Sequence, residues 1–249
     1  MRKKVKRRFF LFLALAALLV LFAVIAPYFA PNDPYATNPA AMKAAPCAQY
    51  PFGTDKLGRC IFSRVLAGAR TSIFSAVFLV AVTFLIGTVI GIFCGYYGGI
   101  FDSLVMRLAD ILMALPEMVL AIAVAGMLGG SMWNAMVALG FAGWTTYARL
   151  AKSQVLIQKK EAYVSAAQMG GCPDLHIMVF HILPNIIGTL VVNATSKIGS
   201  MMMGFAGLSF LGLGVQAPKA EWGSMINDGR AFIQLTPWAV LFPGAAIVL

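Results

Sequence analysis

The stretch "TSIFSAVFLVAVTFLIGTVIGIFCGYYGGIF", residues 71–101, decides the fold because it contains no charged side chain. A helix of about 20 apolar residues crosses the ~30 Å hydrocarbon core of a bilayer. Residues 9–32 and 118–148 are likewise free of charge. The whole chain has 60% hydrophobic and 11% charged residues, whereas soluble domains carry about 25% charged residues. The sequence therefore predicts an all-α, polytopic membrane protein.

Glycines recur at every fourth position of this stretch, at Gly87, Gly91, Gly95 and Gly99. Small residues at this spacing let a second helix approach closely. The alternative is a lipid-facing helix with incidental glycines. The regularity of the ladder favours a packed helix–helix interface.

Six transmembrane helices are predicted, near residues 9–28, 71–95, 104–127, 132–150, 185–212 and from 238 onward. The basic run "RKKVKRR" at residues 2–8 precedes the first of them, which places the N-terminus in the cytoplasm by the positive-inside rule. The apolar run after it is too long for a cleaved signal peptide. The last run, 238–249, would make a helix only ~18 Å long, so we expect that helix to be truncated.

The predicted organisation has three parts. Residues 1–30 are the tail and first helix, 31–70 an extracytoplasmic loop, and 71–249 a transmembrane core with a cytoplasmic loop at 151–184. Charge supports this topology only partly, because the predicted outer loop is itself basic. Its cationic residues are Lys43, Lys56, Arg59, Arg64 and Arg70.

The sequence argues against catalysis and against nucleic-acid binding. The formal charge of +10 is concentrated next to predicted membrane segments. No P-loop, H-E-x-x-H or G-x-S-x-G motif is present, and the Cys and His residues lack metal-ligand spacing. His176 and His181 are five residues apart, off the i, i+4 spacing of two ligands on one α-helix. We therefore expect no cofactor and no metal site on this chain.

Polar residues inside the predicted spans are candidates for a translocation path. Asp110 and Glu117 lie in the third span, seven residues apart and so on one helical face. Asn193 and Lys197 lie in the fifth. Intramembrane charges are costly and usually face a cavity or a partner, so Asp110, Glu117 and Asn193 either line the path or take part in pairing between helices, for instance with Lys197.

A polar interruption, "SAAQMGGCPDLHIMVFHILPN" at residues 165–185, separates the fourth and fifth predicted spans. A short helix with small residues is followed by a break at "CPD" and an apolar restart. Such a helix can dock in a groove of another protein or lie in the lipid headgroups. Periodicity alone leaves both open.

This segment resembles the EAA loop of bacterial ABC-importer permeases, with the pattern E-A-A, three residues, Gly, nine residues and I-x-L-P. Here Ser165 stands in place of the glutamate and His181 in place of the isoleucine. The resemblance implies a coupling helix that contacts an ATPase. The residues implied are Ser165, Ala166, Ala167, Gly171, Asp174, Leu175, His181, Leu183 and Pro184.

Further stretches are similar to the dipeptide, oligopeptide and nickel permeases. They are "FGTDKLGRCIFSRVLAGARTSI", "GYYGGIFDSLVMRLADILMALP", "WTTYARL" and "AGLSFLGLGVQAPKAEWGSMINDGR". The resemblance implies a multi-pass permease subunit of the bacterial inner membrane, importing peptides or nickel. Its implied partners are a second permease, two ATPases that bind ATP and Mg²⁺, and an extracytoplasmic binding protein.

Two alternatives remain from other classes. A secondary transporter or channel needs no ATPase, but we find no inverted repeat. A membrane anchor that assembles a partner would not need polar residues in its spans. In the resembled "GRD" motif Cys60 replaces the aspartate, and Cys47 lies in the same predicted outer loop, where disulfides can form. The two residues are therefore expected either to form a Cys47–Cys60 bridge or to remain separate free thiols.

Overall fold

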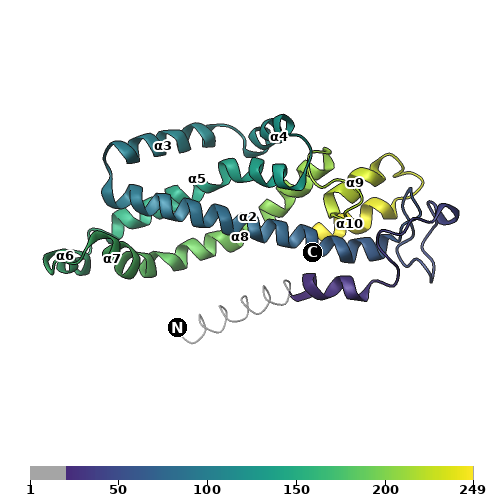
Figure 1. Cartoon of the computed structure of the whole chain (residues 1–249), viewed down its shortest axis with the longest axis horizontal. Coiled ribbons are helices and arrows are strands. Elements are labelled where there is room, and N and C mark those ends of the chain that lie inside the picture. Colours follow the sequence, from purple (N-terminus) through teal and green to yellow (C-terminus); the bar gives the residue numbers. More distant parts are fainter. Residues whose placement is uncertain (1–20, 249) are drawn as a thin grey trace. The chain divides into compact units, whose positions relative to one another are not determined.

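The computed structural model describes residues 21–248. Within that range the chain is helical, and its only β-type pairing is an isolated bridge between Thr54 and Cys60. The all-α class is confirmed. The longer helices are α2 (Ile61–Tyr97), α3 (Gly99–Ala114), α4 (Glu117–Leu128), α5 (Met132–Gln158), α6 (Ala162–Met169), α8 (Leu183–Phe210), α9 (Trp222–Arg230) and α10 (Trp238–Val248) (Figure 1).

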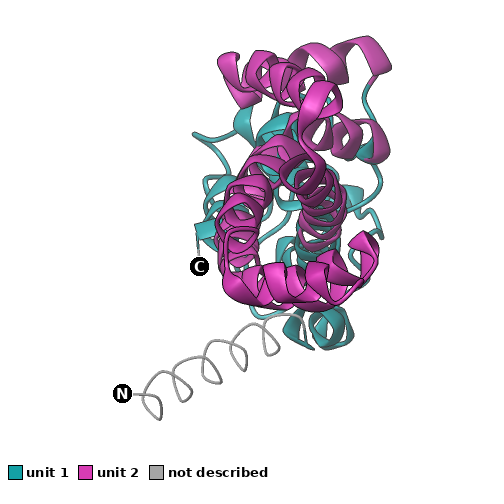
Figure 2. Ribbon diagram, turned by 90° about the vertical axis from the view of Figure 1, so that its left-hand side faces the viewer, with its two compact units in different colours: residues 1–76, 130–132, 205–249 teal, residues 77–129, 133–204 magenta. Residues whose placement is uncertain are grey.

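Two compact units share these helices (Figure 2). Among the described residues, unit 1 comprises 21–76, 130–132 and 205–248, and unit 2 comprises 77–129 and 133–204. α2 and α8 contribute residues to both units.

The predicted first span lies mostly outside the described residues. Residues 21–25 are helical and are followed by a 3₁₀ turn, Ala26–Phe29. By length and composition, two described helical stretches, Ile61–Tyr97 and Asp174–Phe210, can cross a membrane, and α3 with α4 can form a third as a bent pair. The number of six transmembrane helices therefore stays a prediction.

The glycine ladder packs α2 against α5 within unit 2. A Cβ atom on Gly87 would lie 2.3 Å from the carbonyl oxygen of Trp144, and one on Gly91 would lie 2.3 Å from that of Ala148. A Cβ on Gly95 would lie 2.8 Å from the Cβ of Val155. The predicted interface is confirmed at these three positions. Gly99 instead starts α3, with φ +73° and open space around it.

The predicted third span is wrong as a single helix. α3 ends at Ala114, α4 begins at Glu117, and the two are bent by 95°. Pro116 explains the break, because the residue before a proline is disfavoured in the α conformation. Leu115 accordingly has φ −94° and ψ 143°. Asp110 and Glu117 thus belong to different helices and do not share a face.

The chain enters α8 through a π-helical turn, η3 (Ile177–Ile182), which follows the short helix α7 (Asp174–His176). The Leu183 N–H donates to the carbonyl of Met178, five residues back. Pro184 has no N–H to donate. It follows the π-turn directly as the second residue of α8, and the helix continues through it. The fifth helical stretch therefore starts at Asp174 and not near residue 185 as predicted.

Unit 1 combines the loop of residues 30–60 with the start of α2, the end of α8, α9 and α10. The Phe52 ring stacks on that of Phe242 with centroids 3.8 Å apart. Glu221 caps α9, because its carboxylate accepts hydrogen bonds from the N–H groups of Gly223 and Ser224, each 2.8 Å long. This cap satisfies two of the free donors at the start of the helix.

Candidate functional site

The segment that joins α5 to α8, residues 159–182, is called the connecting segment below. α6 ends at Gly170 and Gly171. Gly171 has φ +74°, a left-handed conformation that glycine adopts without a steric cost. The Gly-Gly pair therefore lets the chain turn from α6 into α7.

One side of the connecting segment is anchored in a core cluster of unit 2. Val164 of α6 is fully buried, as are Ile177 and Ile182 of the π-turn. They pack with Met178 of the same π-turn and with residues of α2, α5 and α8, namely Ile92, Tyr96, Ala151, Val155, Ile186 and Leu190. Burying a side chain of this size stabilises a fold by about 1.5–3 kcal/mol, so α6 is firmly held.

The opposite side of the connecting segment is bare. Met169 has 83% of its surface exposed and Leu175 has 61%, beside the small exposed residues Ser165 and Ala166. Exposed apolar side chains gathered on one short segment are typical of an interaction site. Among the residues predicted to contact an ATPase, the exposed ones are Ser165, Ala166, Gly171, Asp174, Leu175 and Pro184, and the half-buried ones are Ala167, His181 and Leu183.

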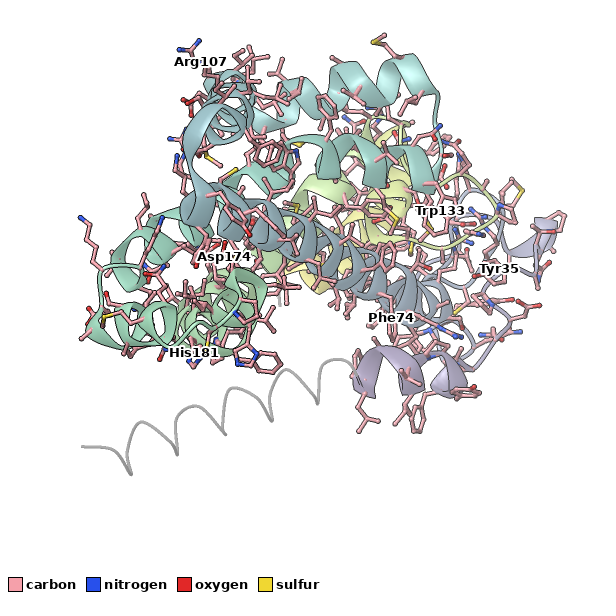
Figure 3. All side chains as sticks on the ribbon, turned by 60° about the vertical axis from the view of Figure 1, so that its left-hand side comes forward. Tyr35, Phe74, Arg107, Trp133, Asp174 and His181 are labelled. Atoms are coloured by element: carbon pink, nitrogen blue, oxygen red, sulfur yellow. The ribbon has the colours of Figure 1, made fainter. Side chains whose placement is uncertain are left out.

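Tyr96, which the sequence analysis missed, ties the connecting segment to the end of α2. Its hydroxyl donates to Asp174 Oδ1 at 2.7 Å, and Gln168 Nε2 donates to the same hydroxyl at 3.4 Å. Lys159 Nζ donates to the Tyr96 carbonyl at 2.6 Å. Figure 3 shows Asp174 and His181 in this part of unit 2. A buried tyrosine inside a "GYYGG" run carries no motif, so only the fold reveals this role.

The polar residues of the predicted spans form pairs between helices. Asp110 of α3 bonds to Arg149 of α5, and not to Lys197. Glu117 lies 4.0 Å from Lys197 of α8. The Asp110 and Arg149 side chains are about half exposed, at 58% and 51%. Pairing of this kind was one of the two alternatives for these residues, and a role in the path stays a prediction.

Asn193 is half-buried on α8, one turn before Lys197. Its Oδ1 atom is buried and has no hydrogen-bond partner among the described residues. A buried acceptor without a partner costs about 1–3 kcal/mol. The side chain can therefore accept a hydrogen bond from a group that approaches α8.

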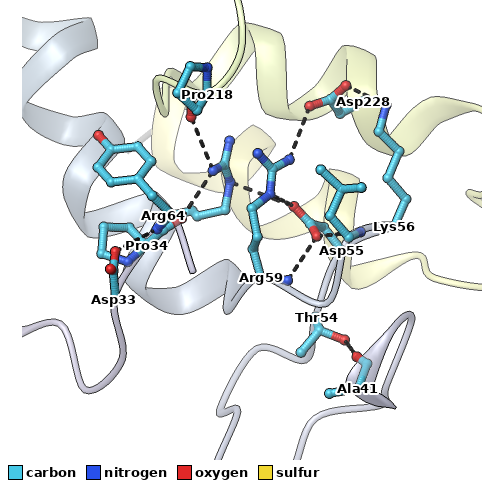
Figure 4. A network of polar contacts seen from close by, with 12 residues as sticks. Asp33, Pro34, Ala41, Thr54, Asp55, Lys56, Arg59, Arg64, Pro218 and Asp228 are labelled. Atoms are coloured by element: carbon cyan, nitrogen blue, oxygen red, sulfur yellow. Dashed lines mark hydrogen bonds and ion pairs between the residues drawn. The ribbon is translucent and has the colours of Figure 1, made fainter. Parts of the chain in front are cut away.

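The basic residues of the predicted outer loop take part in an ion-pair network within unit 1 (Figure 4). Asp55 Oδ2 lies 2.6 Å from Arg59 Nε and 3.7 Å from Arg64 Nε. Asp228 lies 2.7 Å from Lys56 and 3.5 Å from Arg59. Arg64 Nη1 also donates to a backbone carbonyl at 3.1 Å. Lys56, Arg59 and Arg64 thus have structural partners within unit 1.

The two cysteines of the expected bridge are free thiols in the structure. Cys60 is buried at the start of α2, with 2% of its surface exposed, whereas Cys47 is exposed. The bridge is therefore absent from this structure, because one thiol packs inside unit 1 and the other faces outward.

Two family descriptions match this chain. Residues 87–249 match the binding-protein-dependent transport system inner membrane component family. Residues 4–46 match the N-terminal TM domain of oligopeptide transport permease C. Together they cover the core helices and the N-terminal region.

Individual relatives are similar over most of the chain. The dipeptide transport system permease protein DppC of Alkalihalophilus pseudofirmus is 41% identical over 92% of this chain and 76% of its own length. The nickel transport system permease protein NikC of Escherichia coli (strain K12) is 39% identical over 95% and 86%. The glutathione transport system permease protein GsiD of Escherichia coli O6:K15:H31 is 41% identical over 96% and 78%.

Proposed function

The chain belongs to the family of binding-protein-dependent transport system inner membrane components, and we propose that it forms half of the translocation pathway of an ATP-driven importer of small peptides or nickel. It is the permease component of an ABC importer and not an enzyme. In this proposal the connecting segment is the part that receives the force of ATP hydrolysis.

The observation that carries the proposal is the two-sided character of α6. Val164 fixes one side in the core of unit 2, while Ser165, Ala166 and Met169 leave the other side bare. A partner that grips the bare side can therefore move α6 as a rigid body. The bonds of Tyr96 to Asp174 and Gln168 carry that movement to α2.

The proposed partners follow from the family. They are a second permease, two ATP-binding subunits and an extracytoplasmic binding protein, with ATP and Mg²⁺ held by the ATPases and no cofactor held by this chain. The proposed location is the bacterial inner membrane, with the N-terminus and the connecting segment in the cytoplasm and residues 31–70 outside. The absence of charge from residues 71–101 supports a bilayer as the surroundings of α2.

Asp110, Glu117 and Asn193 are the residues proposed to face the path. Peptides and hydrated nickel are polar, and an import path needs polar groups that exchange partners as the solute passes. The long Glu117–Lys197 contact of 4.0 Å and the unpaired Asn193 Oδ1 suit such an exchange. Transport requires that the solute bind the outward and inward states with different affinity.

The test measures ATP hydrolysis by the reconstituted complex, with binding protein that is empty or loaded with dipeptides or Ni²⁺. The variant is Ala166→Arg, which adds a long cation to the bare side of α6 without touching the core. We expect the loaded binding protein to stimulate hydrolysis in the unmodified complex and to have little effect on the variant.

The matched control is Ala48→Arg, the same substitution at an exposed position of the unit 1 loop. It should leave assembly with the ATPases and basal hydrolysis unchanged. Equal stimulation of the Ala166→Arg complex would refute coupling through α6. If no ATPase assembles with the intact chain, the ATP-independent carrier becomes the better hypothesis.

A further inference from the structure

The rings of the two histidines of the chain lie close together at the π-turn, in an edge-on arrangement. Their ring centroids are 5.6 Å apart and their planes meet at 65°. On an α-helix, residues five apart point about 140° away from each other. In a π-turn the hydrogen bonds run from i to i+5, which brings His181 about one turn above His176.

The backbone that carries this pair is held in place from its other side. Ile177, Met178 and Ile182 are buried in the core of unit 2. Asn185 Nδ2 donates to the carbonyl of His181 at 2.6 Å. The Phe180 ring lies 4.7 Å from the His176 ring. The imidazoles are thus preorganised, while His176 is exposed and His181 half-buried, so solutes can reach them.

The distance between the rings fits two ligands of one metal ion. A Zn–N bond is about 2.0–2.1 Å long. Each imidazole centroid then lies roughly 3 Å from the ion, and two imidazoles at tetrahedral angles have centroids about 5–6 Å apart. Neutral imidazole suits Zn²⁺, Ni²⁺ and Cu²⁺. Among residues 21–248 no set of three His, Cys, Asp or Glu side chains is placed to hold a metal, so water or a partner's group completes the coordination.

We propose that His176 and His181 bind one divalent transition ion, Zn²⁺ or Ni²⁺, and that the bound ion clamps the π-turn. The turn joins α7, the short helix that follows α6, to α8. An ion that joins His176 and His181 links the two ends of the π-turn. It therefore resists any unwinding or rewinding of the turn when α6 moves. The functional consequence rests on the proposed function. Because the bound ion opposes the movement of α6, Zn²⁺ or Ni²⁺ bound from the cytoplasm inhibits the importer.

The binding test uses the full chain, purified without a polyhistidine tag, and titrates Zn²⁺ and Ni²⁺ against a chromophoric chelator. The second imidazole binds intramolecularly, and linked ligands gain about a hundredfold or more in affinity. We therefore expect His176→Gln, His181→Gln and the double variant each to weaken binding by about a hundredfold. Single variants that bind as tightly as the unmodified chain would overturn the site.

A second variant separates chelation from general damage to the turn. Phe180→His in the His181→Gln background places the new ring beside His176, where the Phe180 ring now lies at 4.7 Å. Recovery of at least part of the lost affinity supports two-imidazole ligation. Failure to recover, in a chain whose thermal unfolding is unchanged, argues against it.

The functional arm compares stimulated ATP hydrolysis with and without Zn²⁺ in the intact complex and in the His176→Gln variant, each relative to its own rate without metal. We expect inhibition only in the former. Inhibition that is equal in both would overturn the clamp even if the site binds metal. A complex that shows no stimulated hydrolysis before metal is added would refute the proposed function and leave the binding result standing.

Discussion

Asp55, in the loop of unit 1, and Asp174, which begins α7 in unit 2, are both acidic residues, yet they are used in different ways. Asp55 is buried and accepts from two backbone N–H groups as well as from Arg59. Asp174 is exposed and accepts one hydrogen bond, from Tyr96. A buried carboxylate whose oxygens all have hydrogen-bond partners, such as that of Asp55, holds the surrounding loop in one conformation. An exposed segment with few internal hydrogen bonds, such as the one around Asp174, is available to bind another protein.

This contrast predicts where substitutions cost stability and where they cost coupling. The network of unit 1 should behave as a structural unit, with large effects on unfolding. Substitutions in the connecting segment should change the stability of the fold little. They should instead weaken the coupling to an ATPase. The four predictions below test this division, in order of decreasing effect.

Asp55→Asn should have the largest effect on stability. The amide keeps a carbonyl oxygen for the N–H groups of Leu57 and Arg59, but its NH₂ group faces the guanidinium of Arg59. Removing one partner of a buried charge pair costs about 3–5 kcal/mol. Thermal unfolding in detergent should show a clearly lower midpoint. Asp33→Asn, on an exposed residue of the same loop, should change it little, and equal midpoints for both variants would contradict a structural role for the network.

Gly91→Ala should be the next most damaging change, because it overfills the α2–α5 interface. The new Cβ would lie 2.3 Å from the Ala148 carbonyl oxygen, and overpacking costs about 1–3 kcal/mol. Gly126→Ala is the matched control in α4, where the added Cβ meets no atom within 4 Å. Alanine there should stabilise by about 0.5–1 kcal/mol. Two similar midpoints would mean that the ladder does not determine the packing.

Tyr96→Phe should affect coupling more than stability. It removes only the hydroxyl that bonds to Asp174 and Gln168, at a cost of about 0.5–1.5 kcal/mol. We expect stimulated ATP hydrolysis to fall several-fold while the unfolding midpoint moves by a few degrees. Tyr97→Phe, on the exposed neighbour, is the control. A Tyr96→Phe complex with full stimulation would show that α6 does not communicate through this hydroxyl.

The sequence allowed the helical class, the run of α2 and the glycine interface to be predicted, because apolar length and four-residue spacing are local signals. Pro116 was a readable signal for the break after α3 that the hydropathy of residues 104–127 concealed. The π-turn has no such signal, and it brings the His176 and His181 rings to 5.6 Å, closer than five-residue spacing on an α-helix indicates. The partners of Tyr96 and Lys56 lie far away in the sequence, and Lys56 reaches Asp228 across 172 positions. Such contacts follow from packing and cannot be read from a motif.

Glu221→Gln, the last prediction, concerns the slope of stability against pH; at any one pH it also costs some stability, because the amide NH₂ meets one of the two N–H groups that Glu221 caps. Burial raises the pKa of Glu221 above its ordinary value, although hydrogen bonds from Gly223, Ser224, Ser209 and Ser72 act in the opposite direction. The folded state therefore holds this proton more tightly than the unfolded state does. The resulting stabilisation is complete below the ordinary glutamate pKa of about 4.3 and is lost as the pH rises through the raised pKa.

Unfolding midpoints measured from pH 4 to pH 8 should fall more steeply for the unmodified chain than for Glu221→Gln, which cannot titrate. Glu161→Gln, on an exposed glutamate, should reproduce the unmodified profile. Parallel profiles for all three proteins would mean that the cap on α9 holds Glu221 ionised at its usual pKa. In that case Glu221, like Asp55, would have enough hydrogen-bond partners in unit 1 to stay ionised while buried. The contrast with the exposed Asp174 of unit 2 would then be larger.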